Sequence, residues 1–291
     1  MPYSSEHDAT KYNSKTPAAV NCAYTIILLL FNVLFLLFTF HRILIYFPSK
    51  FEITKFNKYT LNTLDNKNLD IYYINNNSDI DIFIFSGNAA EKDDSAVFFN
   101  AFSKFDVNLF TMYYRGFCNR DGHPSELSIK IDIQAVYKFL RERNKKVIIY
   151  GFSIGGGPAI YLSSLFNIPP PIILDNTIFD IGTNLPPIIY YLSRLIVVDK
   201  WKNGEMLKNI ETDVTFFKSG EDTIVNGEHL EKFKKISKNP IDIVYIPSAQ
   251  HWDACFYNVF PAKVKEVIER NYGKKLYGTI QKKELENLKK K

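Results

Sequence analysis

Ser153 has the residue pattern of a catalytic nucleophile. It lies two residues from Gly151 and from Gly155, after the apolar run 147–150 and before a helical pattern over 154–166. A serine on a sharp turn from a strand into a helix needs glycines at these positions, because side chains there would collide with the strand and the helix. The pattern predicts a nucleophile elbow. A chance match in a flexible loop is the alternative, and the rest of the chain must decide.

A serine hydroxyl is a weak nucleophile, so it needs a base and a third group that orients the base. His251 is the one histidine that directly follows an expected strand, over 241–246. The other four lie before the apolar N-terminal segment, at its exit, in a long loop and in a helical pattern: His7, His41, His123 and His229. His251 is therefore the predicted base, and a surface loop histidine is the alternative.

Asp222 is the predicted acid, because it follows the expected strand 214–217. The resulting order of serine, acid and histidine is the order that accompanies a nucleophile elbow of this type. Asp222 could instead cap a turn or a helix. Asp175, which ends the expected strand 172–174, is the second candidate for the acid.

Acyl transfer also needs hydrogen-bond donors for the developing oxyanion. The main-chain N–H of Ile154, at the start of the helix, is one predicted donor. Asn88 is the other, because it follows Gly87 in the loop after the strand 80–85, where the backbone can approach closely. No cysteine or histidine cluster has metal-ligand spacing, so neither a metal nor another cofactor is expected.

Strands and helices alternate along the chain between the N-terminal segment and residue 272. Strands are expected at 51–59, 69–74, 80–85, 107–113, 147–150, 172–174, 214–217 and 241–246. Helices are expected at 94–105, 129–144, 154–166, 227–235 and 262–272, with Pro158 removing a backbone donor from the third. This order predicts an α/β fold, a mostly parallel central sheet flanked by helices, whose ligands bind at the carboxyl ends of the strands. Residues 179–210 exceed one crossover helix and form either a small flap over the site or ordinary core helices.

Residues 22–40 contain no charge and have the length of one membrane-spanning helix. We expect a single-pass anchor here, after a polar tail (1–21) and before the catalytic domain (44–272). A cleaved signal peptide or a buried helix is the alternative, but His41 and Arg42 are no small-residue cleavage site. Lysines and arginines on both sides mildly favour a cytosolic domain. The glycosylation sequon at 76–78 would matter only in a lumenal domain, and the side stays open.

The net charge of +5 is concentrated in the C-terminal tail, 273–291, which has seven lysines and two glutamates. The body of the protein is near neutral, so a nucleic-acid partner is not expected. The tail is either solvated or in contact with anionic lipid. The three cysteines, Cys22, Cys118 and Cys255, are too sparse for a disulfide framework.

Several short motifs along the chain resemble those of one known family. Residues 85–89 resemble F-H-G-N-A, 114–117 resemble Y-R-G-Y, and 124–126 match P-S-E. Residues 151–156 resemble G-x-S-L-G-G and 174–177 resemble L-E-N-T, while Gly220-x-Asp222 and His251 complete the series in order. Together these motifs resemble the α/β-hydrolase domain proteins of the Bem46 type, which include single-pass animal members, and the resemblance covers about residues 40–272.

This resemblance implies an α/β-hydrolase fold and a membrane-anchored serine hydrolase that uses Ser153, Asp222 and His251. Some neighbouring branches remove fatty acyl groups from protein cysteines, so an acyl-containing small molecule, a lipid or an acylated protein is the implied substrate. A catalytically silent scaffold that keeps the fold, and a peptidase, are the alternatives.

Overall fold

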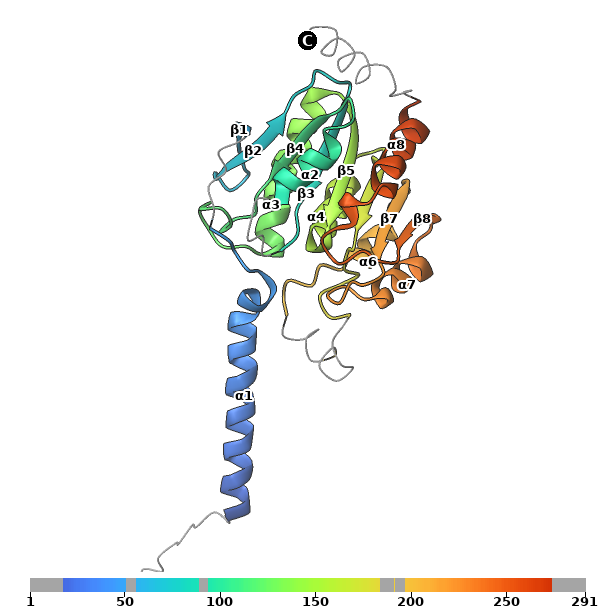
Figure 1. Cartoon of the computed structure of the whole chain (residues 1–291). Coiled ribbons are helices and arrows are strands. Elements are labelled where there is room, and N and C mark those ends of the chain that lie inside the picture. Colours follow the sequence, from blue (N-terminus) through green and yellow to red (C-terminus); the bar gives the residue numbers. More distant parts are fainter. Residues whose placement is uncertain (1–17, 51–55, 89–93, 184–190, 192–196, 274–291) are drawn as a thin grey trace, which may run out of the picture.

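The computed structural model describes residues 18–50, 56–88, 94–183, 191 and 197–273. A long helix, α1 (Ala18–Ile45), projects from an α/β domain (Figure 1). Its segment Val20–Ile43 has 24 residues and is long and apolar enough to cross a membrane. The helix extends beyond the predicted span 22–40 at both ends, from Ala18 to Ile45, so the last four residues of the predicted N-terminal tail, 18–21, are helical. The remainder of that tail and residues 274–291 lie outside the described residues.

The domain is built on one eight-stranded sheet with the order β1-β2-β4-β3-β5-β6-β7-β8. Strands β1 and β2 pair antiparallel, β2 also pairs antiparallel with β4, and the remaining pairs are parallel. The mostly parallel sheet predicted from the alternating elements is thereby confirmed. The strands are β1 (Asn57–Asn62), β2 (Asn68–Ile74), β3 (Ile80–Phe85), β4 (Asn108–Met112), β5 (Lys146–Phe152), β6 (Ile172–Asp175), β7 (Val214–Ser219) and β8 (Ile241–Ile246).

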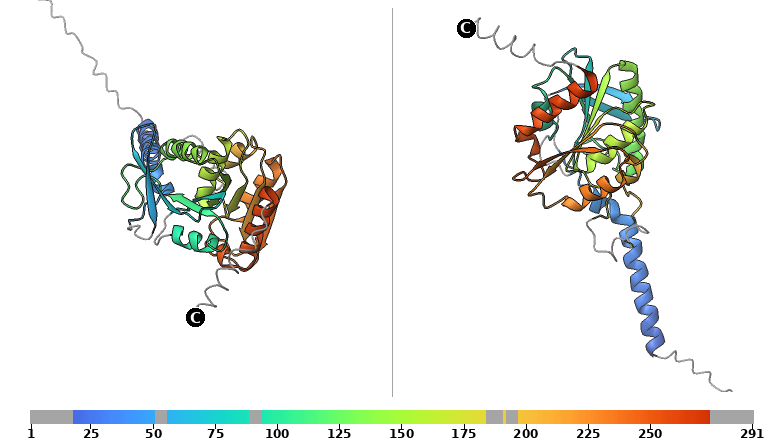
Figure 2. Two further views of the ribbon diagram at one scale, coloured as in Figure 1. Left: turned by 90° about the horizontal axis from the view of Figure 1, so that it is seen from above. Right: turned by 90° about the vertical axis from the view of Figure 1, so that its right-hand side faces the viewer.

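Helices cover both faces of this sheet (Figure 2). One face packs against α2 (Asp94–Phe102) and α8 (Val259–Tyr272). The other packs against α3 (Glu126–Arg143), α4 (Gly156–Ser164), α6 (Asn203–Leu207) and α7 (Gly227–Ile236). Successive residues of β3 serve the two layers in turn, Ile82 in the first and Phe83 in the second. This two-sided burial explains why the central strands read as continuous apolar runs.

Several element boundaries differ from the sequence predictions. Helix α3 begins at Glu126, three residues earlier than expected, because Ser125 and Ser128 form a reciprocal capping box. Helix α8 begins at Val259, which puts Pro261 in its first turn, where a missing N–H costs nothing. Strand β1 continues to Asn62 because its last residues still pair with β2. The expected start of that strand, 51–55, and residues 184–190 and 192–196 of the expected flap lie outside the described residues.

The parallel strands β3, β4, β5, β6, β7 and β8 all have their carboxyl ends at one edge of the sheet. Phe85 pairs with Gly151, Phe152 with Asp175 and Asp175 with Phe217. The loops that carry every candidate site residue leave the sheet at this carboxyl edge. Parallel pairing therefore brings together residues that lie up to 163 positions apart between Asn88 and His251.

Candidate active site

Ser153 occupies a strained turn between β5 and a short 3-10 turn, η1 (Ser153–Gly155), which leads into α4. Its φ is +55°, a left-handed value that is uncommon for a residue with a side chain. A Cβ on Gly151 would lie 2.7 Å from the carbonyl oxygen of Gly155, and one on Gly155 would collide with the main-chain oxygens of Phe85 and Ser86. The turn therefore requires both glycines that flank Ser153 in the sequence pattern.

Pro158 does not disturb this turn. The α-helical part begins at Gly156, so Pro158 is the third residue of α4. The N–H groups in the first turn of a helix have no partner within the helix, and proline is tolerated there. The helix that follows Ser153 consequently starts without losing a hydrogen bond to Pro158.

The structure brings Ser153, His251 and Asp222 together from three different loops. The Nε2 atom of His251 lies 3.0 Å from the Oγ atom of Ser153, and its Nδ1 atom lies 2.8 Å from Oδ2 of Asp222. The second carboxylate oxygen of Asp222 accepts hydrogen bonds from the main-chain N–H groups of Ile224 and Val225. This is the arrangement in which a histidine can take the proton of a serine hydroxyl while a carboxylate fixes its tautomer.

Burial and hydrogen bonding act in opposite directions on Asp222. Its side chain is fully buried, which by itself raises the pKa of a carboxyl group. Three effects outweigh burial and lower the pKa of Asp222 below its usual value: the hydrogen bond to His251, the positive charge that His251 can carry, and the two main-chain N–H donors. Asp222 is thus held as a carboxylate, the form that accepts the Nδ1 proton.

Asp175, the second candidate for the acid, lies elsewhere in the site. Its Oδ2 atom accepts a 2.6 Å hydrogen bond from the hydroxyl of Tyr150, and the contacts of His251 are with Asp222. Complete burial raises the pKa of Asp175 to about 7, and the charge of Asp222 adds to the effect. The structure therefore pairs His251 with the first-choice acid.

The two predicted oxyanion donors flank Ser153. Ile154 follows it within η1. Asn88 follows Gly87, whose backbone lies so close that an added Cβ would be 3.4 Å from Cβ of Ser153 and 2.8 Å from the ring of Phe152. The side chain of Asn88 binds main-chain atoms of Ile45 and Phe47, so the donor predicted at this position would be the main-chain N–H.

Comparison with known proteins agrees with this geometry. The chain is 31% identical over 188 residues to the uncharacterized membrane protein YNL320W of Saccharomyces cerevisiae, covering 61% of this chain and 66% of that protein. It is 28% identical to the protein bem46 of Schizosaccharomyces pombe, over 60% and 62% of the two chains. The human α/β-hydrolase domain-containing protein 17B is 24% identical over 63% and 64%. The chain is a homologue of the Bem46 proteins.

The match spans a little under two thirds of the length of these relatives, and no protein-family model matches the chain. Among solved structures, the esterase Pf2001 of Pyrococcus furiosus superposes with a TM-score of 0.61 at 18% identity, over 77% of this chain and 96% of that one. XC6422 of Xanthomonas campestris, an α/β serine hydrolase without a lid, gives 0.55 at 12% identity over 80% and 99%. At these identities the likeness establishes the α/β-hydrolase fold of this Bem46 homologue.

Asn176 is a supporting residue to which sequence reasoning assigned no role. It has a φ of +44° at the end of β6. Its side-chain amide donates to the hydroxyl of Ser219 at 2.8 Å and to the main-chain oxygen of His251 at 3.0 Å, and its carbonyl oxygen accepts from the N–H of Ser219. Asn176 therefore ties the loop of the histidine to β7. Its position within the Bem46-like 174–177 motif was the available signal.

Lys218 is a second such residue, buried on β7 below the acid. Its ammonium group donates to the main-chain oxygens of Ser219 and Val225 and lies 3.6 Å from Oδ2 of Asp222. Burial lowers the pKa of Lys218, and the neighbouring carboxylate of Asp222 works against this shift. The positive charge of Lys218 compensates the buried negative charge of Asp222.

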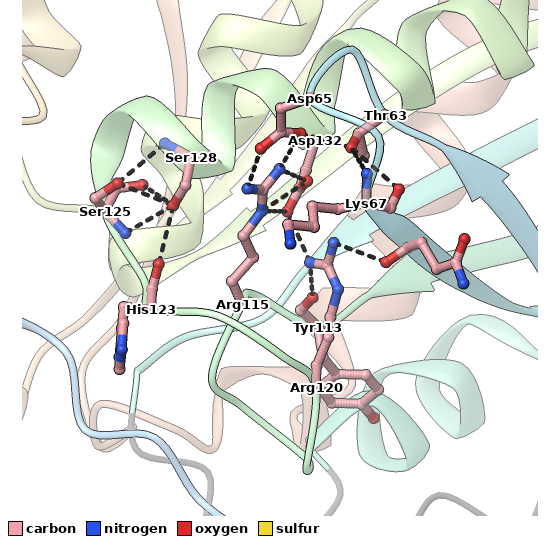
Figure 3. Close-up of polar contacts among 11 residues, drawn as sticks. Thr63, Asp65, Lys67, Tyr113, Arg115, Arg120, His123, Ser125, Ser128 and Asp132 are labelled. Carbon is pink, nitrogen blue, oxygen red and sulfur yellow. Dashed lines mark hydrogen bonds and ion pairs between the residues drawn. The ribbon is translucent and has the colours of Figure 1, made fainter.

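The Y-R-G-F motif holds the loop after β4 through a buried network of charges (Figure 3). The Arg115 guanidinium binds both the fully buried Asp132 on α3 and Asp65 in the β1–β2 turn. Arg120 also binds Asp132, at 2.7 Å. With the loop fixed in this way, the Tyr114 hydroxyl donates to the main-chain oxygen of Ser86 at 3.0 Å. The network thus supports, from a distance, residues 86–88, which we call the oxyanion loop after the donor predicted at Asn88.

Proposed function

We propose that this chain is a membrane-anchored serine hydrolase that cleaves acyl ester or thioester bonds. Ser153 is the nucleophile, His251 the general base and Asp222 the group that orients the base. One observation carries the proposal: a serine with φ of +55° at the carboxyl edge of the sheet lies 3.0 Å from a histidine whose other nitrogen is bound to a buried carboxylate. Strained backbone conformations of this kind cluster at functional sites.

The reaction follows from this geometry. As the Oγ atom of Ser153 attacks the substrate carbonyl, Nε2 of His251 takes the hydroxyl proton, and Asp222 stabilises the resulting imidazolium. The tetrahedral intermediate collapses when the imidazolium gives its proton to the leaving alcohol or thiol. A water molecule, activated by the same histidine, then attacks the acyl-serine and releases the carboxylic acid.

Main-chain donors would stabilise the negative charge on the carbonyl oxygen during both steps. The N–H groups of Ile154 and Asn88 belong to the two segments that border Ser153. Because such groups are fixed by the fold, they need no reorganisation when the charge develops, and one donor of this kind is typically worth about a hundredfold in rate.

The proposed anchor is α1, with the hydrolase domain on the cytosolic side. Besides the distribution of lysines and arginines, the folded sequon supports this side. The Nδ2 atom of Asn76 donates to the main-chain oxygen of Val107, and the hydroxyl of Ser78 donates to the main-chain oxygen of Asp106. A glycan would have to share the Asn76 nitrogen with this bond. Endoglycosidase treatment of the expressed protein should leave its mobility unchanged, and a shift would place the domain in the lumen.

Labelling with a fluorophosphonate tests the proposal directly. The full-length protein in detergent should be labelled, and Ser153→Ala should not. Ser164→Ala is the matched control. Ser164 is exposed at the end of α4, the helix that follows Ser153, so its substitution should leave labelling intact. Equal labelling of all three proteins would refute Ser153 as the nucleophile, and a folded wild type that takes no label would favour the silent scaffold.

The bond that is cleaved can be assigned with matched substrates. Esters, thioesters and amides that share one acyl group should be compared, followed by a series of acyl chain lengths. Faster turnover of long-chain thioesters, including a palmitoylated cysteine peptide, would support protein depalmitoylation. Preferential hydrolysis of the amide would instead indicate a peptidase.

A further inference from the structure

The end of α1 is part of the hydrolase domain and not a free linker. We call residues Ile45–Ser49 the exit segment. Tyr46 is only 3% exposed, and its hydroxyl accepts a 2.9 Å hydrogen bond from Nε1 of Trp201. The main-chain oxygen of Ser49 accepts from the N–H of Cys118, and Arg42 pairs with the buried Asp199. The candidate membrane span of α1, Val20–Ile43, therefore leads directly into contacts with the domain at its C-terminal end.

The exit segment lies directly beside the oxyanion loop. The Asn88 side chain bridges it, accepting from the N–H of Phe47 at 2.9 Å and donating to the main-chain oxygen of Ile45. Gly87, the preceding residue, packs against Phe152 and Ser153. Accordingly, α1 projects from the carboxyl edge of the sheet. The C-terminal end of α8 lies on the opposite side of the domain (Figures 1 and 2).

Large apolar side chains are exposed next to the catalytic residues. Trp252, 59% exposed, directly follows His251, and its ring meets that of Phe256, which is 60% exposed. Ile224, two residues after Asp222, is 62% exposed, and Phe47 in the exit segment is 53% exposed. Exposed aromatic residues near an apolar helix are typical of the membrane–water interface. We call these four residues, Phe47, Ile224, Trp252 and Phe256, the mouth surface.

From these contacts we infer that the mouth surface rests in the headgroup region of the bilayer that α1 enters, so that the site takes acyl groups directly from that bilayer. Only the second half of this inference rests on the proposed hydrolase function. Ile45 lies two residues beyond Ile43, which is about 3 Å along a helix. The headgroup layer is about 5–7 Å thick on each side of the hydrocarbon core. The bridge from Ile45 to Asn88 therefore holds the oxyanion loop at headgroup depth.

This position selects a class of substrate. The mouth surface presents apolar side chains to the bilayer, so an acyl chain can pass from lipid to the site without crossing water. The leaving group stays on the water side of the interface. Lipids and acylated proteins that already reside in the same bilayer fit this geometry better than acyl groups dissolved in water.

Tryptophan fluorescence tests the contact without any hydrolysis. The chain has two tryptophans, the fully buried Trp201 and the exposed Trp252. The full-length protein is reconstituted into phosphatidylcholine vesicles with and without lipids brominated on the acyl chains, which quench nearby indoles. Subtracting the emission of the Trp252→Phe variant from that of the wild type gives the fluorescence of Trp252 alone. This Trp252 fluorescence should be present in unbrominated vesicles and quenched in brominated ones.

A matched control places an indole at the opposite edge of the sheet. Lys145 is exposed immediately before β5, at the amino ends of the strands, so the double variant Lys145→Trp/Trp252→Phe should keep its added emission in brominated vesicles. An unquenched Trp252 component, or equal quenching at positions 145 and 252, would overturn the inference. Ser153→Ala should show the wild-type quenching, which separates a failure of membrane contact from a failure of the proposed chemistry.

Discussion

Asp175→Asn is the substitution that tests the electrostatics of the site most sharply. Asp175 is 2% exposed at the end of β6, and its Oδ2 atom accepts the hydrogen bond of the Tyr150 hydroxyl. Burial raises the pKa of Asp175 to about 7, and the charges of Asp222 and Asp253 act in the same direction. Asparagine keeps the shape of the side chain and an acceptor for Tyr150, and it removes the titration.

The sign of the effect follows from the direction of this shift. An aspartate in an unfolded chain has a pKa of about 3.9. Between about pH 4 and pH 7 the folded protein therefore binds a proton at Asp175 that the unfolded chain lacks, so the stability contributed by this group falls as pH rises through that window. One pKa unit corresponds to about 1.4 kcal/mol, so raising the pH from about 5 to about 7 should cost the wild type about 2 kcal/mol more than the variant.

Urea unfolding of both full-length proteins in detergent at several pH values measures this difference. The free energy of unfolding of the variant minus that of the wild type should rise steadily between pH 5 and pH 7. A difference that stays constant within about 0.5 kcal/mol, the usual size of a surface effect, would refute the assigned protonation of Asp175. Fluorophosphonate labelling should survive in Asp175→Asn, because the contact of His251 is with Asp222.

Three further substitutions probe the supports of the site. Asp222→Asn should reduce kcat on an acyl ester about 10⁴-fold, because an amide no longer stabilises the correct histidine tautomer and its charged form. Gly155→Ala should lower the free energy of unfolding by about 1–3 kcal/mol in urea titrations and slow probe labelling, because its Cβ would press on the main-chain oxygens of Phe85, at the end of β3, and Ser86, in the oxyanion loop. Arg115→Met should cost about 3–5 kcal/mol in the same titrations, because it removes one partner of the buried Asp132 carboxylate.

Each of these outcomes can fail in a recognisable way. An Asp222→Asn protein within tenfold of wild-type kcat would place the orienting acid elsewhere. Wild-type stability and labelling in Gly155→Ala would show that the oxyanion loop can shift freely. An unchanged urea midpoint in Arg115→Met would mean that Arg120 alone neutralises Asp132. Arg115→Lys is the matched control for charge, and it should restore only part of the stability, because an ammonium group cannot reproduce the forked contacts of a guanidinium.

Local patterns in the sequence were sufficient to predict most of the fold. Strands β3 and β8 have the predicted bounds, 80–85 and 241–246, because apolar runs with clear polar borders define buried strands. The order of Ser153, Asp222 and His251, after β5, β7 and β8, predicted a convergence that the parallel register produces. The start of α3 was missed because its capping box uses two serines in place of the usual serine and glutamate.

Long-range contacts account for what the sequence could not reveal. Tyr46 and Trp201 are 155 positions apart, and no periodicity or spacing links a residue at the end of an apolar helix to one before α6. Asn88 was expected as an oxyanion donor, but the bridge formed by its side chain depends on where α1 enters the domain. Such contacts are properties of the folded chain, and a reading limited to local patterns does not contain them.

These contacts connect the end of α1 both to Glu126 on α3 and to the oxyanion loop. The Glu126 carboxylate accepts from the main-chain N–H of Trp201, the Trp201 indole donates to Tyr46, and the residues on either side of Tyr46 bind the side chain of Asn88. None of these side chains is among the proposed catalytic groups. Because oxyanion stabilisation depends on donors that are already in place, residues that hold the loop contribute to the rate without touching the substrate. The proposed membrane anchor, α1, is on this reasoning also a structural support of the proposed active site.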